Sequence, residues 1–227
     1  MIKLENVVLA SPEQMNFVIE GMRNPMNSWG KSDSHDCKQN SSFCMECECN
    51  KIGYRLGEND ISLMQRLSNA VTEHRKYMRM MPVYVRITAP LYWWKEFDTY
   101  KVGTVANSCS TMHKIAEKGF TLGDFSIEHL NDDRSAELSN VEWLEHLIHH
   151  LNRDRLRFIE TKDKQYWWQM IQLLPSSYNQ TRNVMLNYEV LANIYRQRKN
   201  HKLDEWREVC KWIESLPYSE LITGEEE

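Results

Sequence analysis

The chain has 227 residues, 41% of them hydrophobic and 26% charged, with a formal net charge of −4 and a pI near 6.1. This length suits one large domain or two small ones, and the lack of a basic excess argues against a nucleic-acid-binding protein. No apolar run is long enough for a transmembrane helix, and the N-terminus lacks the apolar core of a signal peptide. We therefore expect a cytoplasmic protein without a membrane partner.

The N-terminal part of the sequence predicts a strand followed by a helix. Residues 1–9 end in an apolar run that is typical of a short strand. The Ser-Pro-Glu sequence beginning at Ser11 is a helix start, with an N-cap, a proline at the first helical position and an acid in the first turn. We expect this helix to run to about Met22 and a loop to follow over residues 23–30, which contain Pro and Gly.

A cysteine-rich segment follows at residues 31–51. It holds four of the six cysteines, and Cys44 and Cys47 form a C-x-x-C pair whose thiolates can share one tetrahedral metal ion. In a reducing cytoplasm such a cluster favours zinc over disulfides. However, the spacing matches no standard zinc finger, and the segment is rich in Ser, Asn and Lys. Two interpretations stay open, a variable surface loop and a structural zinc site at Cys37, Cys44, Cys47 and Cys49.

The middle of the chain predicts a further helix and a further strand. Apolar residues recur on one helical face from Asp60 to Ala70, and apolar and polar residues alternate from Met81 to Thr88. Further on, a long helix is expected to begin at Ser139 or Asn140, and another helix spans Gln165 to Leu174. The long helix carries three histidines, His146, His149 and His150. No carboxylate is well placed to complete a metal site with them, so they indicate a solvated helix face.

The stretch from Trp93 to Lys114 is the most distinctive part of the sequence. Its aromatic first half has helical spacing, and Gly103 separates it from a run of short polar residues that includes Asn107 and Ser110. Short hydrogen-bonding side chains next to positive charge suit an anionic ligand such as a nucleotide phosphate. The alternative interpretation is a helix, a turn and a polar loop without a ligand. Cys109 has no evident base beside it and is interpreted as a packing residue.

The C-terminal part predicts two more helices. The residues from Tyr178 to Leu186 fit either a strand or an irregular segment. In the helix predicted from Asn187 to Arg198, the two terminal residues share one face, so that Arg198 can reach an anion and Asn187 a polar ring. The alternative is that Asn187 caps the helix and Arg198 is solvated. An amphipathic helix follows from Leu203 to Leu216, and the whole pattern predicts one helix-dominated α/β domain.

Several of these features resemble the flavin-dependent thymidylate synthases, roughly from Asp60 to Ile213. In that family a Glu-His pair leads into a strand, and here Glu73-His74 precedes the predicted strand. The family signature then contains Arg-His-Arg, a serine, Asn-Glu, a second serine and Arg-Tyr. Asn107 falls on the signature Asn and Ser110 on its second serine. The family's later Leu-Pro, helix-opening Asn, second Asn and Arg have counterparts in Leu174-Pro175, Asn187, Asn193 and Arg198.

The resemblance implies a fold, a reaction and roles for residues. The fold is a single helix-rich α+β domain over residues 1–227, around a mostly antiparallel sheet, with the cysteine-rich segment as an insertion. The reaction is reductive methylation of dUMP at C5, or modification of a related pyrimidine nucleotide, with FAD as cofactor and NADPH and a folate one-carbon donor as co-substrates. The protein is expected to be a homotetramer with shared active sites. Ser110 and Arg198 are expected to hold the nucleotide and serve catalysis, and four residues to lie around the flavin: His74, Asn107, Asn187 and Asn193.

The chain departs from the family signature where arginines are expected. Tyr100-Lys101-Val102 replaces the Arg-His-Arg triplet, Met112-His113 replaces Arg-Tyr, and Glu189 replaces an arginine two residues past the helix-opening Asn. Arginine grips phosphates through two parallel hydrogen bonds, which neither Met nor Glu provides. The alternative function is therefore a nucleotide-binding homologue without flavin chemistry. Among the remaining arginines, Arg198 is the first candidate to stabilise negative charge on the ligand, and Arg182 the second.

Overall fold

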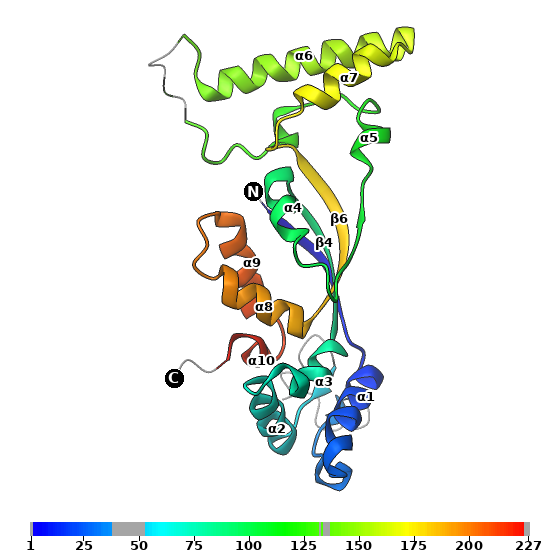
Figure 1. Cartoon of the computed structure of the whole chain (residues 1–227), viewed down its shortest axis with the longest axis vertical. Coiled ribbons are helices and arrows are strands. Elements are labelled where there is room, and N and C mark those ends of the chain that lie inside the picture. The colour runs from blue at the N-terminus through cyan, green and yellow to red at the C-terminus, as the bar shows by residue number, and fades with distance from the viewer. Residues whose placement is uncertain (1, 38–52, 132, 134–136, 225–227) are drawn as a thin grey trace. The chain divides into compact units, whose positions relative to one another are not determined.

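The computed structural model (Figure 1) is an α+β protein, as predicted, and it describes residues 2–37, 53–131, 133 and 137–224. Its main sheet is antiparallel and has four strands in the order β1-β4-β6-β5. These strands are β1 (Lys3–Leu9), β4 (Pro82–Pro90), β6 (Asn179–Asn187) and β5 (Val105–Ser108). A second, two-stranded antiparallel sheet pairs β2 (His35–Asp36) with β3 (Tyr54–Arg55).

The chain forms two compact units. Unit 1 consists of Met1–Lys3, Ile87–Thr99 and Asn107–Asn183, and unit 2 of Leu4–Arg86, Tyr100–Ala106 and Val184–Glu227. Each strand of the four-stranded sheet has residues in both units. The single domain expected over residues 1–227 remains a prediction. Within the part of the chain that the structure describes, no helix combines the length and apolarity needed to cross a membrane.

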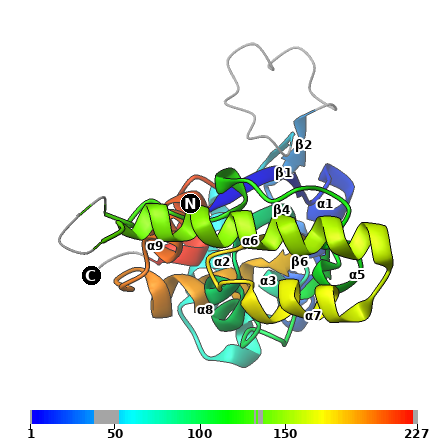
Figure 2. The ribbon, with the colours of Figure 1, turned by 90° about the horizontal axis from the view of Figure 1, so that it is seen from above.

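Unit 1 contains the long helix α6 (Asn140–Thr161), which packs beside α7 (Lys164–Leu173) (Figures 1 and 2). The helix α6 begins as predicted, because the Ser139 hydroxyl accepts a hydrogen bond from the Glu142 amide and Glu142 reaches back to the Ser139 amide. Its buried face joins an apolar core with residues of the preceding segment and of α7. The core consists of Ile115, Phe120, Phe125, Leu144, Ile148, Leu151 and Met170. His146, His149 and His150 are exposed, which confirms the solvated face.

The predicted aromatic helix is α4 (Leu91–Phe97), also in unit 1. Trp93, Trp94 and Phe97 are buried, and the Trp93 ring lies 4.9 Å from the Trp94 ring and 5.2 Å from the Phe97 ring, between centroids. Aromatic rings of this size bury much apolar surface and hold one another in defined orientations. The helix α4 is therefore a rigid element. Two short helical turns complete the unit, α5 (Thr111–Lys114) and η5 (Leu122–Asp124).

Unit 2 is built from helices at both ends of the sequence. Its elements are α1 (Pro12–Arg23), η1 (Asn24–Met26), η2 (Trp29–Lys31), α2 (Glu58–Ser68), η4 (Thr72–Arg75), α3 (Lys76–Arg79), α8 (Tyr188–Arg198), α9 (Asp204–Glu214) and α10 (Glu220–Thr223). The N-cap of α1 is Ser11, as predicted, in a capping box with Gln14. Met15, Met64 and Trp206 are fully buried in this unit. The segment from Tyr178 to Leu186, which fitted either a strand or an irregular segment, forms most of β6. The loop expected after α1 contains η1 and η2.

A buried ion pair joins α1 to α2. Arg23 Nε donates to Asp60 Oδ1 over 2.6 Å, and Asp60 Oδ2 accepts further hydrogen bonds from the backbone and side chains of residues 32–34. These bonds fix the chain as it enters the cysteine-rich segment. Cys37 is buried, whereas Cys44, Cys47 and Cys49 lie outside the described residues, so the zinc site remains a prediction.

Candidate functional site

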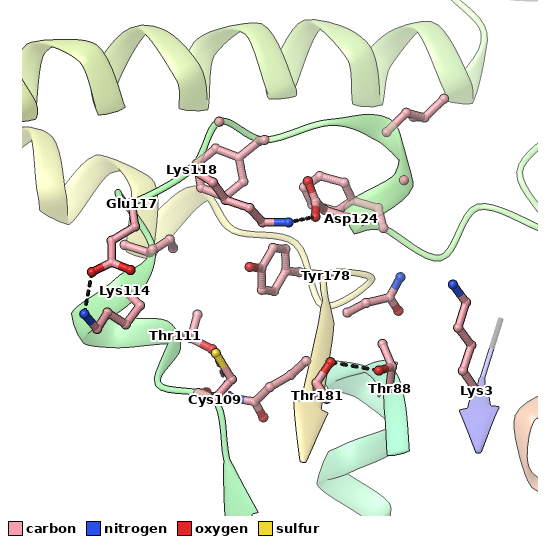
Figure 3. Close-up of a pocket in the computed structure, with 18 of the residues that line it drawn as sticks. Lys3, Thr88, Cys109, Thr111, Lys114, Glu117, Lys118, Asp124, Tyr178 and Thr181 are labelled. Atoms are coloured by element: carbon pink, nitrogen blue, oxygen red, sulfur yellow. Dashed lines mark hydrogen bonds and ion pairs between the residues drawn. The ribbon is translucent and has the colours of Figure 1, made fainter. Parts of the chain in front are cut away.

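Unit 1 contains a cavity of about 860 Å³ (Figure 3). Its walls come from the start of β6, the end of β4 and the segment between residues 109 and 128. This volume is within the usual range for small-molecule sites. The predicted ligand residue Ser110 lines the cavity, together with Lys3, Thr88, Cys109, Thr111, Lys114, Ile115, Glu117, Lys118, Gly119, Phe120, Leu122, Gly123, Asp124, Phe125, Ile127, Glu128, Tyr178, Asn179, Gln180 and Thr181.

One wall of the cavity is polar and held by a connected set of hydrogen bonds. The Cys109 amide donates to the Thr181 carbonyl over 3.0 Å, and the Gln180 side-chain amide donates to the Cys109 carbonyl and to Thr111 Oγ1 over 3.1 and 3.0 Å. The hydroxyls of Thr88 and Thr181 are 2.8 Å apart. These bonds link β6 to the residues on both sides of Ser110, and they position that serine.

Ser110 is the N-cap of α5. Its hydroxyl oxygen accepts a hydrogen bond from the His113 amide over 3.3 Å. A serine hydroxyl that accepts one bond can still donate its own hydrogen to a ligand. Its neighbour Cys109 is exposed and lines the cavity, so the interpretation of Cys109 as a buried packing residue is wrong.

The opposite wall is aromatic, and Tyr178 lies in the middle of the cavity in Figure 3. The rings of Phe120 and Phe125 meet the Tyr178 ring edge to face, with centroids 6.2 and 5.6 Å away. Burial, followed by the nearby Asp124 carboxylate, raises the pKa of the Tyr178 hydroxyl. The hydroxyl therefore stays protonated at neutral pH and can donate a hydrogen bond.

Lysines contribute positive charge to the cavity. Lys114 pairs with Glu117, and Lys118 pairs with Asp124 over 2.5 Å. The hydrogen bond of each pair raises the pKa of its lysine, so both ammonium groups are charged at neutral pH. The Lys114 and Glu117 side chains are 59% and 63% exposed, and ion pairs between such exposed groups are weak, whereas the Asp124 side chain that pairs with Lys118 is only 14% exposed. An entering anion can therefore compete with Glu117 for Lys114.

In unit 2, the predicted Arg198 is held by two aromatic side chains. Its Nε donates to the Tyr100 hydroxyl over 2.9 Å, and its guanidinium lies 4.7 Å from the centre of the Trp206 ring. Tyr100 in turn donates to Gln197 Oε1 over 2.9 Å. Tyr100, which stands at the first position of the replaced Arg-His-Arg triplet, thus fixes the orientation of Arg198. The contact with the Trp206 ring adds a cation–π attraction.

Asn187 caps α8, so the capping interpretation holds for its side chain. Its Oδ1 accepts from the Val190 amide over 3.0 Å, and its Nδ2 donates to the Gly103 carbonyl over 3.5 Å. Gly103 has a φ of +77°, and a Cβ at this position would lie 3.0 Å from Asn187 Nδ2. The chain therefore needs glycine here to turn between the two halves of the distinctive stretch.

The other predicted site residues are exposed. His74 lies in η4 and Asn193 on α8, where Asn193 Oδ1 accepts from Arg196 Nη2 over 2.6 Å, and Asn107 lies in β5. Asn107 and Ser110 belong to unit 1, whereas His74, Asn187, Asn193 and Arg198 belong to unit 2. Their joint action at one flavin and nucleotide site remains a prediction.

Arg182, the second candidate to stabilise negative charge on the ligand, already has a counter-ion in the structure. Arg182 Nη1 donates to Asp98 Oδ1 over 2.6 Å, and its guanidinium stacks 4.1 Å from the centre of the Trp94 ring. Its charge is thus paired within unit 1, which suits a positioning role.

Tyr178 was not predicted as a site residue, because a tyrosine next to a predicted turn carries no signal of its own. Its only hint is the position three residues after Pro175, before a possible strand.

Comparison with solved structures identifies the fold. The flavin-dependent thymidylate synthase ThyX from Helicobacter pylori, complexed with FAD and dUMP, matches 99% of this chain and 97% of its own, with a TM-score of 0.63 and 17% identity. A second structure of Helicobacter pylori thymidylate synthase X with FAD and dUMP matches 99% of this chain and 98% of its own, with a TM-score of 0.64 and 16% identity.

A third structure, the UMP/dUMP methylase PolB from Streptomyces cacaoi bound with 5-Br dUMP, matches 98% of this chain and 95% of its own, with a TM-score of 0.57 and 12% identity. No family model and no curated protein sequence matches the chain. At these identities the likeness shows the fold alone. The chain has the fold of the flavin-dependent thymidylate synthases, which a UMP/dUMP methylase shares.

Proposed function

We propose that this protein is a flavin-dependent enzyme that modifies a pyrimidine nucleotide at C5, with reductive methylation of dUMP as the expected reaction. The observation that carries the proposal is the match of the fold over at least 98% of the chain to two synthase structures and one methylase structure. Those proteins bind FAD with dUMP, or 5-Br dUMP. From the family resemblance of the sequence we also propose a homotetramer, and a cytoplasmic location from the sequence.

The cavity of unit 1 is the proposed nucleotide site. Its aromatic wall around Tyr178 suits a planar base, and its polar wall offers hydrogen-bond partners at Ser110 and Thr111. A nucleotide phosphate carries negative charge that Lys114 can bind once its exposed ion pair with Glu117 opens. This supports the role of Ser110 as a nucleotide ligand.

Arg198 is the proposed electrostatic catalyst. The bonds to Tyr100 and the Trp206 ring hold its guanidinium before any ligand arrives. A pre-positioned cation stabilises negative charge that develops on a ligand without reorganisation during the reaction. His74 and Asn193 are exposed polar residues of unit 2 and are available to a cofactor, and Asn107 and Asn187 are proposed to lie at the same flavin.

FAD, when bound, supplies the hydride transfer, with NADPH as its reductant and a folate as the one-carbon donor. Methylation replaces the C5 hydrogen, which leaves as a proton. The residues of the chain therefore have to bind and orient the nucleotide and exclude water, and no side-chain nucleophile is required.

A second candidate function is nucleotide binding without flavin chemistry. Glu189 stands where the related signature has an arginine, and it forms an ion pair with Arg79 in unit 2. An acidic residue at this position repels phosphate, and the pair consumes one nearby positive charge. This candidate predicts a colourless protein that still binds dUMP in the cavity.

The two candidates differ in the visible absorption spectrum. Flavin bands that persist through gel filtration after incubation with FAD, together with dUMP-dependent release of tritium from C5-labelled dUMP, would support the enzyme. A protein that binds dUMP but retains no flavin at saturating FAD would refute it and favour the second candidate.

Variants of the cavity test where the nucleotide binds. Ser110→Ala is expected to weaken dUMP binding about 10-fold, the effect of one lost hydrogen bond to a charged or polar ligand. Lys95→Ala is the matched control for Lys114→Ala, because Lys95 is exposed in unit 1 and does not line the cavity. Unchanged dUMP affinity in both Ser110→Ala and Lys114→Ala would move the nucleotide out of the cavity.

A further inference from the structure

We infer that Gln180 is a positioning residue that fixes the direction of hydrogen bonding in the polar wall of the cavity. It makes Thr111 a donor toward the ligand, so that this wall takes an acceptor oxygen rather than an amino group. The assignment of that oxygen to a nucleotide rests on the proposed function, whereas the direction of the bonds follows from the wall itself. Neither residue stands at a position that the family signature names.

The side-chain oxygen of Gln180 faces a group that can only donate. Arg182 Nε donates to Gln180 Oε1 over 2.9 Å, and an arginine carries N–H donors, has no acceptor and stays protonated. The guanidinium is itself held in place, because its Nη1 donates to Asp98 Oδ1 over 2.6 Å and it lies 4.1 Å from the centre of the Trp94 ring. The Arg182 side chain is 15% exposed and does not line the cavity, so its contact with the wall is made through Gln180.

The side-chain nitrogen of Gln180 faces two acceptors on the other side. Its Nε2 donates to the Cys109 carbonyl over 3.1 Å and to Thr111 Oγ1 over 3.0 Å. A backbone carbonyl can only accept. Turning the amide over would place its oxygen against the Cys109 carbonyl and its NH2 group against the Arg182 guanidinium, and both bonds would be lost. The orientation of the Gln180 amide is therefore fixed at both ends.

The backbone around this amide is fixed as well. Trp94 Nε1 donates to the Gln180 carbonyl over 2.9 Å, and the Cys109 amide donates to the Thr181 carbonyl over 3.0 Å. These bonds join α4, β6 and the segment before α5. A hydrogen-bonding group whose supporting residues are held in this way keeps its direction before a ligand arrives.

The orientation of the amide reaches the ligand through Thr111. A hydroxyl group has one hydrogen to donate and lone pairs that accept. Because Thr111 Oγ1 accepts from Gln180, its hydrogen points away from the amide, and no group of the described residues accepts it. Thr111 lines the cavity and lies beside Cys109 (Figure 3). Its hydrogen is therefore available to an acceptor atom of a bound molecule.

Two neighbours of Thr111 have the same direction. Ser110 Oγ accepts from the His113 amide, so its hydrogen is also free to be donated, and the Lys114 ammonium has donors only. A ligand oxygen, either a base carbonyl or a phosphate oxygen, would meet donors at this wall. An amino group would meet donors as well, and its own hydrogens would lose their acceptors in water without replacement.

The test is a double-mutant cycle on dUMP binding to the full-length protein, measured by isothermal titration calorimetry. Thr111→Val keeps the shape of the side chain but removes the hydroxyl, and it is expected to weaken dUMP binding about 10-fold. Gln180→Glu keeps the size and still accepts from Arg182, but its carboxylate would take the Thr111 hydrogen, and a similar loss is expected. In the Thr111→Val background, Gln180→Glu should change the affinity less than about 2-fold, because the hydrogen that it redirects is already absent.

Two controls accompany the cycle. Gln172→Glu adds the same charge at an exposed position of α7 in unit 1 that does not line the cavity, and it is expected to leave dUMP affinity unchanged. Deoxyuridine, which lacks the phosphate, identifies the acceptor. Thr111→Val should weaken the binding of both ligands if Thr111 donates to a base carbonyl, and of dUMP alone if it donates to a phosphate oxygen. Either result supports the inference.

The opposite outcomes are distinct from a failure of the proposed function. A loss caused by Gln180→Glu that is equally large with and without the Thr111 hydroxyl would overturn the inference, and so would unchanged dUMP affinity in Thr111→Val. Both results leave the proposed function standing, whereas a wild type that binds no dUMP would refute the nucleotide site and this inference with it. If Gln180→Glu fails to fold, Arg182→Met takes its place: a loss that disappears in the Thr111→Val background supports the inference, and an equal effect in both backgrounds overturns it.

Discussion

Replacing Asp60 by asparagine is expected to destabilise unit 2 strongly. The Asp60 side chain is fully buried and accepts from five donors: Arg23 Nε, the hydroxyls of Ser32 and Ser34, and the amides of Asp33 and Ser34, over 2.6 to 3.1 Å. Asparagine has one acceptor oxygen, and its NH2 group would face donors instead of acceptors. The Arg23 side chain, which is 4% exposed, would also lose its counter-charge.

The expected loss follows from these contacts. Removing one partner of a buried ion pair costs about 3–5 kcal/mol, because the remaining charge stays buried without compensation. That is a large part of the 5–15 kcal/mol typical of a folded domain. Urea unfolding of Asp60→Asn, followed by circular dichroism, measures the loss against the wild type. A loss below about 1 kcal/mol would show that water or rearranged side chains satisfy Arg23, and would refute this reasoning.

The same carboxylate predicts the direction of the pH dependence. Burial, the largest influence, raises the Asp60 pKa, but hydrogen bonds from Ser34, Ser32, Arg23 and the Asp33 amide outweigh it, so the pKa is lowered. A carboxyl with a depressed folded pKa stabilises the fold above its unfolded pKa of about 3.9 and loses this contribution as the pH falls through the folded value. The wild type should therefore lose stability below about pH 4 more steeply than Asp60→Asn, when both are unfolded by urea between pH 3 and 6.

Three further substitutions test local contacts of the fold. Gly57→Ala should destabilise the protein by about 1–3 kcal/mol in urea unfolding, because its Cβ would lie 2.2 Å from Asp33 Cγ. An unfolding midpoint equal to that of the wild type would contradict this steric clash. Asn187→Ala should cost about 1 kcal/mol through loss of the α8 cap, whereas Asn187→Asp should retain most of it; equal losses would argue against capping. His149→Ala, at an exposed position of α6, should change stability by less than about 0.5 kcal/mol, and a larger loss would reveal a missing contact.

Much of the local structure followed from the sequence because local chemistry sets it. The hydroxyl oxygens of Ser11 and Ser139 and the side-chain oxygen Oδ1 of Asn187 accept hydrogen bonds from free backbone N–H groups of the next turn, so these caps mark where α1, α6 and α8 begin. Likewise, alternation buries Val83 and Val85 in β4 and exposes Tyr84. The β6 segment was ambiguous, because most of its first half is polar and only partly buried.

Contacts between distant parts of the chain were decided by the tertiary structure alone. The strand order β1-β4-β6-β5 brings residues 178–181 next to residues 109–111, and only this pairing creates the cavity and exposes Cys109 to it. Sequence spacing carries no information about such pairs, because side chains more than 60 positions apart meet only through the pairing of strands and the packing of helices. The sequence by itself determined the elements and the candidate ligands Ser110 and Arg198, whereas the fold decided which charges are paired.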